Sequence, residues 1–431
     1  MIKFHATILL ANGLDDCGRA TNSYVEIDRC VRVFRNREVS SRFLLILGSV
    51  AALAIFSSTM SKNPALPLLA LDIGASEAQI GLVSSISPIP GILISSVVGA
   101  YSDRHGRSGI ITLSLLIFAT APFLYLFVTE VWQLALVRFY HGFATAMFMP
   151  VAMAAVADRF QSSSRGQALG AYSSFTMAGR FMAPFMGGAL IFYASFTSLY
   201  LVIGLSAIVA LSLSLAIPWD AKGTVVHAKR FEGSTVSALG SVVKERRIMV
   251  TSSMEALQYF AMGAFEAFLP IYMDQVLHFN TLEIGFVMGI QVVAMLLTKP
   301  LMGRLSDRRG RVPFIVGGLL LGGVAIALMP LASNLYVLAG LSIAFGLTVA
   351  TVTASTSALV TEIAGSSAHG SSIGVLSSIM DVGHSVGPFV TGLVIGMVSF
   401  TAGFGLAAVL LIVGAIIFAA EMRTTVDRMS K

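Results

Sequence analysis

Five ionisable residues lie inside long apolar stretches of the sequence, where a charge is costly to place. They are Arg138, His141, Glu255, Glu266 and Asp381. A carboxylate or an imidazole in such a place can hold a proton, and a charged side chain can hold a substrate. The alternative for each of them is a structural ion pair or a buried hydrogen bond.

Spacing indicates which of these side chains share a helix face. Arg138 and His141 are three residues apart and therefore point the same way from one helix. Glu255 and Glu266 are eleven residues apart, which at 100° per residue returns to within about 20° of one face. Measured from residue 260, Glu255 lies about 7 Å to one side and Glu266 about 9 Å to the other. We expect an acidic stripe on this helix.

The elements that hold these residues must be helices that cross a membrane. The chain has 431 residues, of which 56% are hydrophobic and 12% charged, whereas soluble domains have about 25% charged residues. A span needs about 20 apolar residues, and the runs lack the alternation of barrel strands. Twelve such runs are present, at about 43–61, 79–101, 109–128, 132–157, 167–193, 196–217, 248–273, 282–302, 313–331, 335–360, 371–397 and 401–420. The sequence predicts an all-α membrane protein with 12 transmembrane helices.

Lysine and arginine indicate which loops are cytoplasmic. With both termini inside, 24 of the 28 basic residues fall in cytoplasmic segments. Lys62 falls in an external loop, and the other three, Arg138, Arg180 and Lys299, fall within helices. The net charge of +6 is then explained by loops that face anionic lipid, and nucleic acid is not an expected partner. We expect a multi-pass protein of a bacterial or archaeal cytoplasmic membrane.

The runs divide the chain into two halves joined by one long polar loop. Residues 43–217 and 248–421 are each expected to form a six-helix bundle. Residues 218–247 read as a cytoplasmic linker, 1–42 as a cytoplasmic tail with little ordered structure, and 422–431 as a second tail.

The two halves repeat one another at an offset of 204 residues. "GAYSDRHGR" at 99–107 aligns with "GRLSDRRGR" at 303–311, and "GAYSSFTMAGRFMAPFMGG" at 170–188 aligns with "GVLSSIMDVGHSVGPFVTG" at 374–392. Two halves of equal orientation predict pseudo-symmetric bundles, as in transporters built from parallel repeats.

The first repeated phrase resembles a signature of the major facilitator superfamily, G-x-L-[AS]-D-R-x-G-R-[RK], found between helices two and three. The first copy has Tyr101 for the leucine and Ser108 for the final base. The resemblance implies gating roles, with Asp103 and Asp307 paired either with loop arginines or with a facing helix N-terminus. The matching residues are Gly99, Asp103, Arg104, Gly106 and Arg107, and Gly303, Asp307, Arg308, Gly310 and Arg311.

The second repeated phrase resembles the helix-five motif of drug:proton antiporters, g-x8-G-x3-G-P-x2-G-G, with Ala183 in place of one glycine. Small residues let helices approach closely, and an internal proline bends a helix. The residues expected to pack helices in this way are Gly170, Gly179, Pro184, Gly187 and Gly188, and Gly383, Gly387, Pro388 and Gly392 in the second half.

"LALVRFYHGFATA" is similar to the superfamily's helix-four motif, with His141 in place of the usual glutamine. The resemblance links Arg138 to proton coupling. It also implies that helices one, four, seven and ten line a cavity, which Arg138, Glu255 and Glu266 would share.

Four further groups need partners or an exit to water. Asp381 and His384 lie near mid-membrane, and Arg180 occupies the position equivalent to His384, where pairing is favoured over substrate contact. Lys299 lies near a helix end and is expected to extend its amine to the interface.

The sequence has no P-loop, no paired metal-ligand spacing and no Gly-x-Ser-x-Gly elbow in a suitable setting. We therefore expect no enzyme activity, cofactor or metal, and a monomer driven by a gradient. The leading hypothesis is proton-coupled export of hydrophobic or cationic small molecules by alternating access. An uptake symporter or facilitator is an alternative, because 43–61 lacks the carboxylate that many drug antiporters place there. A non-transporting membrane sensor or scaffold is a third.

Overall fold

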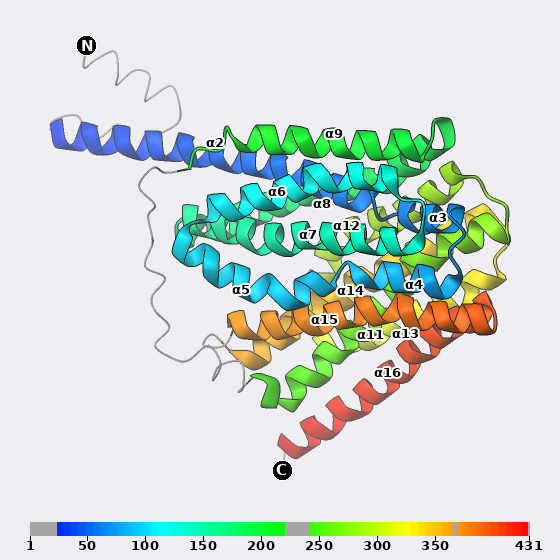
Figure 1. Ribbon diagram of the computed structural model, residues 1–431. Coiled ribbons are helices and arrows are strands. Elements are labelled where there is room, and N and C mark those ends of the chain that lie inside the picture. Colours follow the sequence, from blue (N-terminus) through cyan, green and yellow to red (C-terminus); the bar gives the residue numbers. More distant parts are fainter. Residues whose placement is uncertain (1–23, 220–241, 366–368, 430–431) are drawn as a thin grey trace.

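The structure is a computed structural model of the chain and describes residues 24–219, 242–365 and 369–429. Within these ranges every regular element is a helix (Figure 1). The first half comprises α2 (Tyr24–Met60), α3 (Ala65–Asp72), α4 (Glu77–Ile86), α5 (Ile89–His105), α6 (Arg107–Leu124), η1 (Tyr125–Phe127), α7 (Val131–Arg159), α8 (Ser162–Tyr193) and α9 (Phe196–Ser214). The second comprises α11 (Arg246–Gln275), α12 (Thr281–Arg309), α13 (Arg311–Leu328), η2 (Met329–Leu331), α14 (Leu335–Ala364), α15 (His369–Met397) and α16 (Phe400–Met429).

The predicted helical membrane fold is confirmed. Eleven segments of the described residues are long and apolar enough to cross a membrane. The twelfth predicted span corresponds to α11, which has 30 residues and carries the polar Glu255, Gln258 and Glu266 along its length. Residues 1–23 of the predicted N-terminal tail and 220–241 of the predicted linker lie outside the described residues.

The first span differs from its prediction at both ends. Helix α2 begins at Tyr24, inside the segment expected to be a tail with little order. The span itself runs from Val39 to Asp72, because a second apolar segment, α3, continues after a break at 61–64. The prediction of an external loop at Lys62 was therefore wrong: the polar residues around Pro64 interrupt the helix but do not end the span.

The two halves meet along two helix pairs, α4 with α15 and α8 with α12. In Figure 1 the blue-to-green first half lies above the second half, with the helices of both running along one axis. We call the end where α3 ends at Asp72 and α11 ends at Gln275 the closed end. The end where α5 meets α6 and α12 meets α13 is called the basic end, because it carries Arg107 and Arg311.

Contact between the halves is tightest toward the closed end. A methyl group on Gly285 of α12 would lie 2.9 Å from the Cα of Gly188 of α8, so the two backbones touch. The Thr281 hydroxyl also donates a hydrogen bond to the Gly188 carbonyl at 3.1 Å. Buried Leu66 and Ile80 of the first half share one apolar core with the second half.

The same pair of helices separates toward the basic end. A cavity of about 590 Å³ lies there, lined by residues 173–181 of α8 and 295–300 of α12. Cavities of this size accommodate a small organic molecule. The bundle is therefore closed at one end of the α8–α12 seam and open at the other.

Candidate functional site

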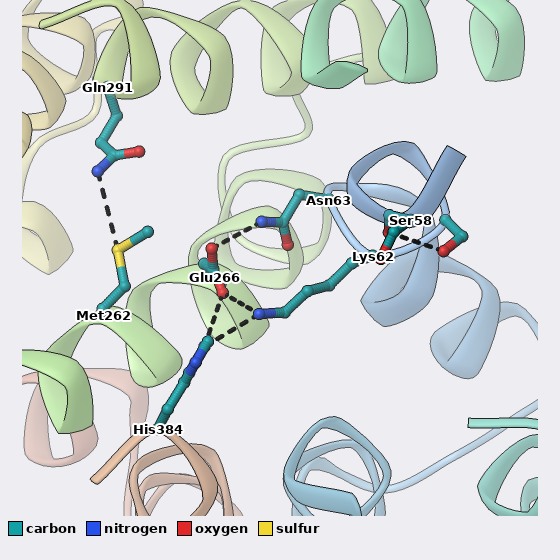
Figure 2. A network of polar contacts seen from close by, with 8 residues as sticks. Ser58, Lys62, Asn63, Met262, Glu266, Gln291 and His384 are labelled. Atoms are coloured by element: carbon teal, nitrogen blue, oxygen red, sulfur yellow. Dashed lines mark hydrogen bonds and ion pairs between the residues drawn. The ribbon is translucent and has the colours of Figure 1, made fainter. Parts of the chain in front are cut away.

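An ion pair joins the two halves near the closed end (Figure 2). Lys62 Nζ lies 2.6 Å from Glu266 Oε2. Asn63 Nδ2 donates a hydrogen bond to the other carboxylate oxygen at 2.9 Å. His384 Nε2 lies 3.1 Å from Glu266 Oε2 and 2.9 Å from Lys62 Nζ. We call Lys62, Asn63, Glu266 and His384 the inter-half cluster.

The break between α2 and α3 positions the two residues that the first half contributes. Asn63 N still bonds to Thr59 O at 2.8 Å, and Leu66 N bonds to Lys62 O at 3.3 Å, so the chain turns without losing its helical course. Pro64, which lacks an N–H, opens the interruption and precedes α3. Lys62 and Asn63 therefore project toward the second half from inside the span.

Close packing of α11 against α15 positions the other two residues. A methyl group on Gly387 would lie 2.8 Å from the Cα of Phe260, and one on Gly383 would lie 2.9 Å from the Cα of Ala256. Backbones that approach this closely bring His384, which lies between the two glycines in sequence, next to Glu266. The predicted small-residue motif thus builds the cluster as well as the bundle.

The inter-half cluster has room for a water molecule but not for a drug-sized substrate. The recess beside it holds about 10 Å³ and is lined by Leu66, Ser84 and Pro388 among others. About this volume is needed for one water. Glu266 has a side chain only 12% exposed, so its charge is balanced by Lys62 and not by bulk solvent. The recess is too small for a drug-sized molecule.

The second acidic residue of α11 faces a different neighbour. Glu255 is 4% exposed and accepts a hydrogen bond from the hydroxyl of Thr356 on α14. Tyr259 lies between the two carboxylates on α11, with its ring 5.7 Å from that of His384. The structure thus places Glu255 and Glu266 at two separate contacts of one helix.

Arg138 lies inside the first half, within electrostatic range of Lys62 but in contact with no member of the inter-half cluster. It is 3% exposed, and its Nη1 donates to the hydroxyl of Tyr125 at 3.3 Å. The same hydroxyl lies 3.4 Å from His141 Nδ1, and the Tyr125 ring stacks on Tyr200 at 4.5 Å. Among the described residues, Arg138 Nε and His141 Nε2 lack hydrogen-bond partners. The structure brings Arg138 to His141, as predicted from spacing, but does not bring it into contact with Glu266 or Glu255.

The remaining predicted groups lie around the space between the halves. Asp381 on α15 faces α5, where a methyl group on Gly91 would lie 3.9 Å from its carboxylate. Lys299 is exposed and lines the 590 Å³ cavity. Arg180 is exposed and lies within electrostatic range of His384 on one side and Lys299 on the other.

The two copies of the signature form the same network at the basic end. Arg107 pairs with Asp103 and with Asp158, the latter at 3.0 Å, and donates to Ser102 Oγ at 2.6 Å. Gly106 has φ of +94°, which lets α5 end and α6 begin within one residue.

In the second copy Arg311 pairs with Asp307 and with Glu362, the latter at 2.8 Å, and donates to Ser306 Oγ at 3.0 Å. Its turn residue Gly310 has φ of +91°. Each network lies within one half. Of the two partners considered for Asp103 and Asp307, the structure has the loop arginine. Arg104 and Arg308 lie exposed in the last turns of α5 and α12, and Gly99 and Gly303 lie more than one turn before them.

The packing glycines divide between contacts within and between the halves. A methyl group on Gly179 would lie 3.0 Å from the carbonyl carbon of Ala52 on α2, and one on Gly187 would lie 3.3 Å from Met60 Cγ. A methyl group on Gly392 of α15 would lie 3.2 Å from the Cα of Gly81 on α4, so this glycine packs between the halves. Gly170 has no atom within 4 Å of that position, so in this state it packs against nothing.

Sequence reasoning did not assign Asp158, Glu362, Lys62 or Asn63 to a site. The 204-residue offset identifies Asp158 and Glu362 as an equivalent pair, but it does not show that they pair with Arg107 and Arg311. Lys62 and Asn63 could have been found from the apolar segment "ALPLLAL" directly after Pro64, which continues the first span.

Comparison with known proteins agrees with this architecture. The model of the Major Facilitator Superfamily matches residues 47–282 and 251–429. The chain is 22% identical over 386 residues to the multi-drug resistance efflux pump PmrA homolog of Lactococcus lactis, covering 85% of this chain and 92% of that protein. It is 21% identical over 326 residues to the chromaffin granule amine transporter of Rattus norvegicus, covering 75% of this chain and only 61% of that protein.

A solved structure has the same fold. The inward-facing, unoccupied crystal structure of a bacterial homolog of the human lysosomal transporter Spinster superposes with a TM-score of 0.74 at 18% identity, covering 89% of this chain and 96% of that one. With the family model spanning nearly all of both halves, the chain belongs to the major facilitator superfamily and is a multi-pass secondary transporter.

Proposed function

We propose that the protein is a proton-coupled exporter of hydrophobic small molecules that works by alternating access. The observation that carries the proposal is the ion pair between Lys62 and Glu266, which joins the two halves at 2.6 Å. Both halves of the transport path lie in one chain, so a monomer suffices.

The basic residues indicate which side of the membrane the cavity opens to. Cytoplasmic loops are enriched in lysine and arginine, so the basic end is assigned to the cytoplasm. The closed end, with Asp72 and Gln275, then faces the outside. In this assignment the structure is an inward-facing state, with its 590 Å³ cavity accessible from the cytoplasm.

Proton coupling follows from the position of Glu266 between the halves. Protonation of Glu266 would remove one charge of the pair that holds the external end closed. When the halves separate there, the carboxylate becomes free to take a proton from outside. Re-forming the ion pair requires loss of that proton, and coupling requires that it leave toward the cytoplasmic cavity after the external end has closed. His384 Nε2 can donate to Glu266 or accept from Lys62, according to its tautomer, which suits it to relay the proton.

Export of a hydrophobic molecule is supported by the cavity lining and by one relative. Met177, Phe181 and Met295 line the cavity, and methionine adapts to ligands of varied shape. The Lactococcus relative is named as a multi-drug efflux pump. A cationic substrate is less favoured than the sequence alone indicated, because Lys62 occupies Glu266 and Thr356 binds Glu255.

The test is substrate flux into everted vesicles across a panel of hydrophobic dyes, with and without a proton uncoupler. We expect wild-type flux to stop with the uncoupler and Glu266→Gln to abolish gradient-driven flux at normal expression. Flux that ignores the uncoupler would favour a facilitator, and gradient-driven movement in the opposite direction would favour an uptake symporter. No flux of any compound, with unchanged behaviour of Glu266→Gln, would favour a sensor or scaffold.

A further inference from the structure

Cations outnumber carboxylates in the interior of the described spans. Inside the described spans there are four cations, Lys62, Arg138, Arg180 and Lys299, and three carboxylates, Glu255, Glu266 and Asp381. Of the carboxylates, Glu255 and Asp381 form no ion pair with a described residue. Lys62 pairs with Glu266, and Arg138 is held by Tyr125 within the first half. Arg180 and Lys299 remain, and neither forms an ion pair with a described residue.

These two cations lie beside the cavity. Lys299 is one of its lining residues, next to Met295 one turn earlier on α12. Arg180 lies between the lining residues Met177 and Phe181 on α8, within electrostatic range of Lys299. The cavity therefore has largely apolar walls, with Lys299 in its lining and Arg180 beside it. Glu255 acts electrostatically on Lys299 but forms no ion pair with it.

We propose that Lys299 and Arg180 bind the anionic group of an amphipathic organic anion, whose hydrophobic part occupies the cavity between α8 and α12. The proposal rests on the proposed transport function and names its substrate class. The occupant is a small transported molecule with a carboxylate or sulfonate, and not a lipid of the surrounding bilayer.

Charge is the reason for this choice. An unpaired cation inside a membrane protein is costly, and an anion that enters the cavity would lower that cost, whereas a cation would raise it. The guanidinium of Arg180 can bind a carboxylate or sulfonate through two parallel hydrogen bonds, and Lys299 adds a point charge. The nearest carboxylate that acts on Lys299 is Glu255, which already accepts the hydroxyl of Thr356.

The position of Arg180 also connects the substrate to the inter-half cluster. Arg180 lies within electrostatic range of Lys62 and His384. An anion bound at Arg180 would attract Lys62 and so compete with Glu266 for it. Substrate binding from the basic end would in this way weaken the contact that holds the other end closed.

The test compares two probes that share one ring system. 8-Anilinonaphthalene-1-sulfonate carries a sulfonate, and N-phenyl-1-naphthylamine is its neutral counterpart. Binding of each is measured by fluorescence on the full-length protein in nanodiscs of neutral phosphatidylcholine. We expect Lys299→Gln and Arg180→Gln each to weaken binding of the sulfonate by about tenfold, the effect of losing one hydrogen bond to a charged group. Binding of the neutral probe should change less than twofold.

Two controls make the result specific. Lys244→Gln removes an exposed cation at the basic end and should change neither probe. Lys299→Arg keeps the charge and should retain the sulfonate, which separates a lost charge from a damaged fold. Equal loss of both probes, or no loss of either, would overturn the proposal.

The remaining outcomes separate this proposal from its rivals. If phosphatidylglycerol in the nanodisc displaces the sulfonate but Lys299→Gln does not slow its flux into everted vesicles, the site belongs to a lipid and the proposal fails. Because binding is measured without a pH gradient, loss of proton coupling would leave these results intact. Failure of anion binding would likewise leave the behaviour of Glu266→Gln intact.

Discussion

Lys62 from the first half and Glu266 from the second half form an ion pair, with Nζ 2.6 Å from Oε2, and the carboxylate has further partners from both halves. Neither charge has another full counter-charge among its described contacts. Because the pair joins the two halves, we expect it to break when this end of the bundle opens.

The pair should show strong coupling in a double-mutant cycle. Lys62→Ala leaves Glu266 buried with its charge uncompensated, which costs about 3–5 kcal/mol in other proteins. Glu266→Gln in the same chain removes that charge. We expect the single variant Lys62→Ala to have a lower melting temperature in detergent than the double variant Lys62→Ala, Glu266→Gln. Additive shifts would show that the two side chains do not interact in solution.

Removal of Lys62 should also open the closed end. In a chain with Cys17 and Cys30 replaced by serine, Ser84→Cys places a thiol beside the recess. We expect Lys62→Gln to raise the labelling rate of that thiol by an impermeant maleimide added from outside. Lys244→Gln, an exposed lysine elsewhere, is the matched control. Equal rates in all three proteins would contradict the role of the pair in closure.

Asp103 and Asp307 should act on the opposite end. In this state each pairs with an arginine of its own half. We predict that the same carboxylates stabilise closure of the basic end in the alternate state. Asp103→Asn should then raise cytoplasmic labelling of Ser173→Cys in the cavity and lower turnover. Glu421→Gln, which removes the partner of the exposed Arg246, is the control. Unchanged labelling with full turnover would remove Asp103 from the gate.

Larger residues at the helix seam should destabilise the closed end. Gly188→Leu would drive a side chain into the backbone of Gly285, which already lies in contact. We expect faster external labelling of Ser84→Cys and a lower melting temperature. Gly166→Ala on the same helix meets no atom within 4 Å and should leave both measurements unchanged. If Gly188→Leu changed neither the labelling rate nor the melting temperature, the close contact of α8 and α12 would not be needed for closure.

The spans could be predicted because lipid imposes one simple rule on length and composition. The boundary at Lys62 was misplaced because polar residues interrupt the helix there without ending the span. Hydropathy averaged along the sequence does not distinguish such a break from a loop. The difference depends on whether the second half supplies a partner for Lys62, which here is Glu266.

The candidate site was predicted in part for a similar reason. A buried carboxylate is conspicuous in an apolar run, so Glu266 could be found from its surroundings. Its partners come from the break between α2 and α3 and from α15, and no spacing along the chain relates them. Arg180 and His384 occupy equivalent positions of the 204-residue repeat, but only His384 contacts Glu266. The repeat relates positions and does not predict which of the two side chains reaches the carboxylate.

The backbone contact of Gly188 with Gly285 is a point about which α8 can tilt. Fifteen residues of α8 separate Gly188 from Ser173, a lever arm of about 22 Å. Tilting α8 by 10° about that contact would move Ser173 by about 4 Å while displacing the glycines hardly at all. A small tilt of α8 about this contact is thus amplified into the opening or sealing of the cavity mouth, while the segment around Asn63, which lies beside the neighbouring Gly187, hardly moves.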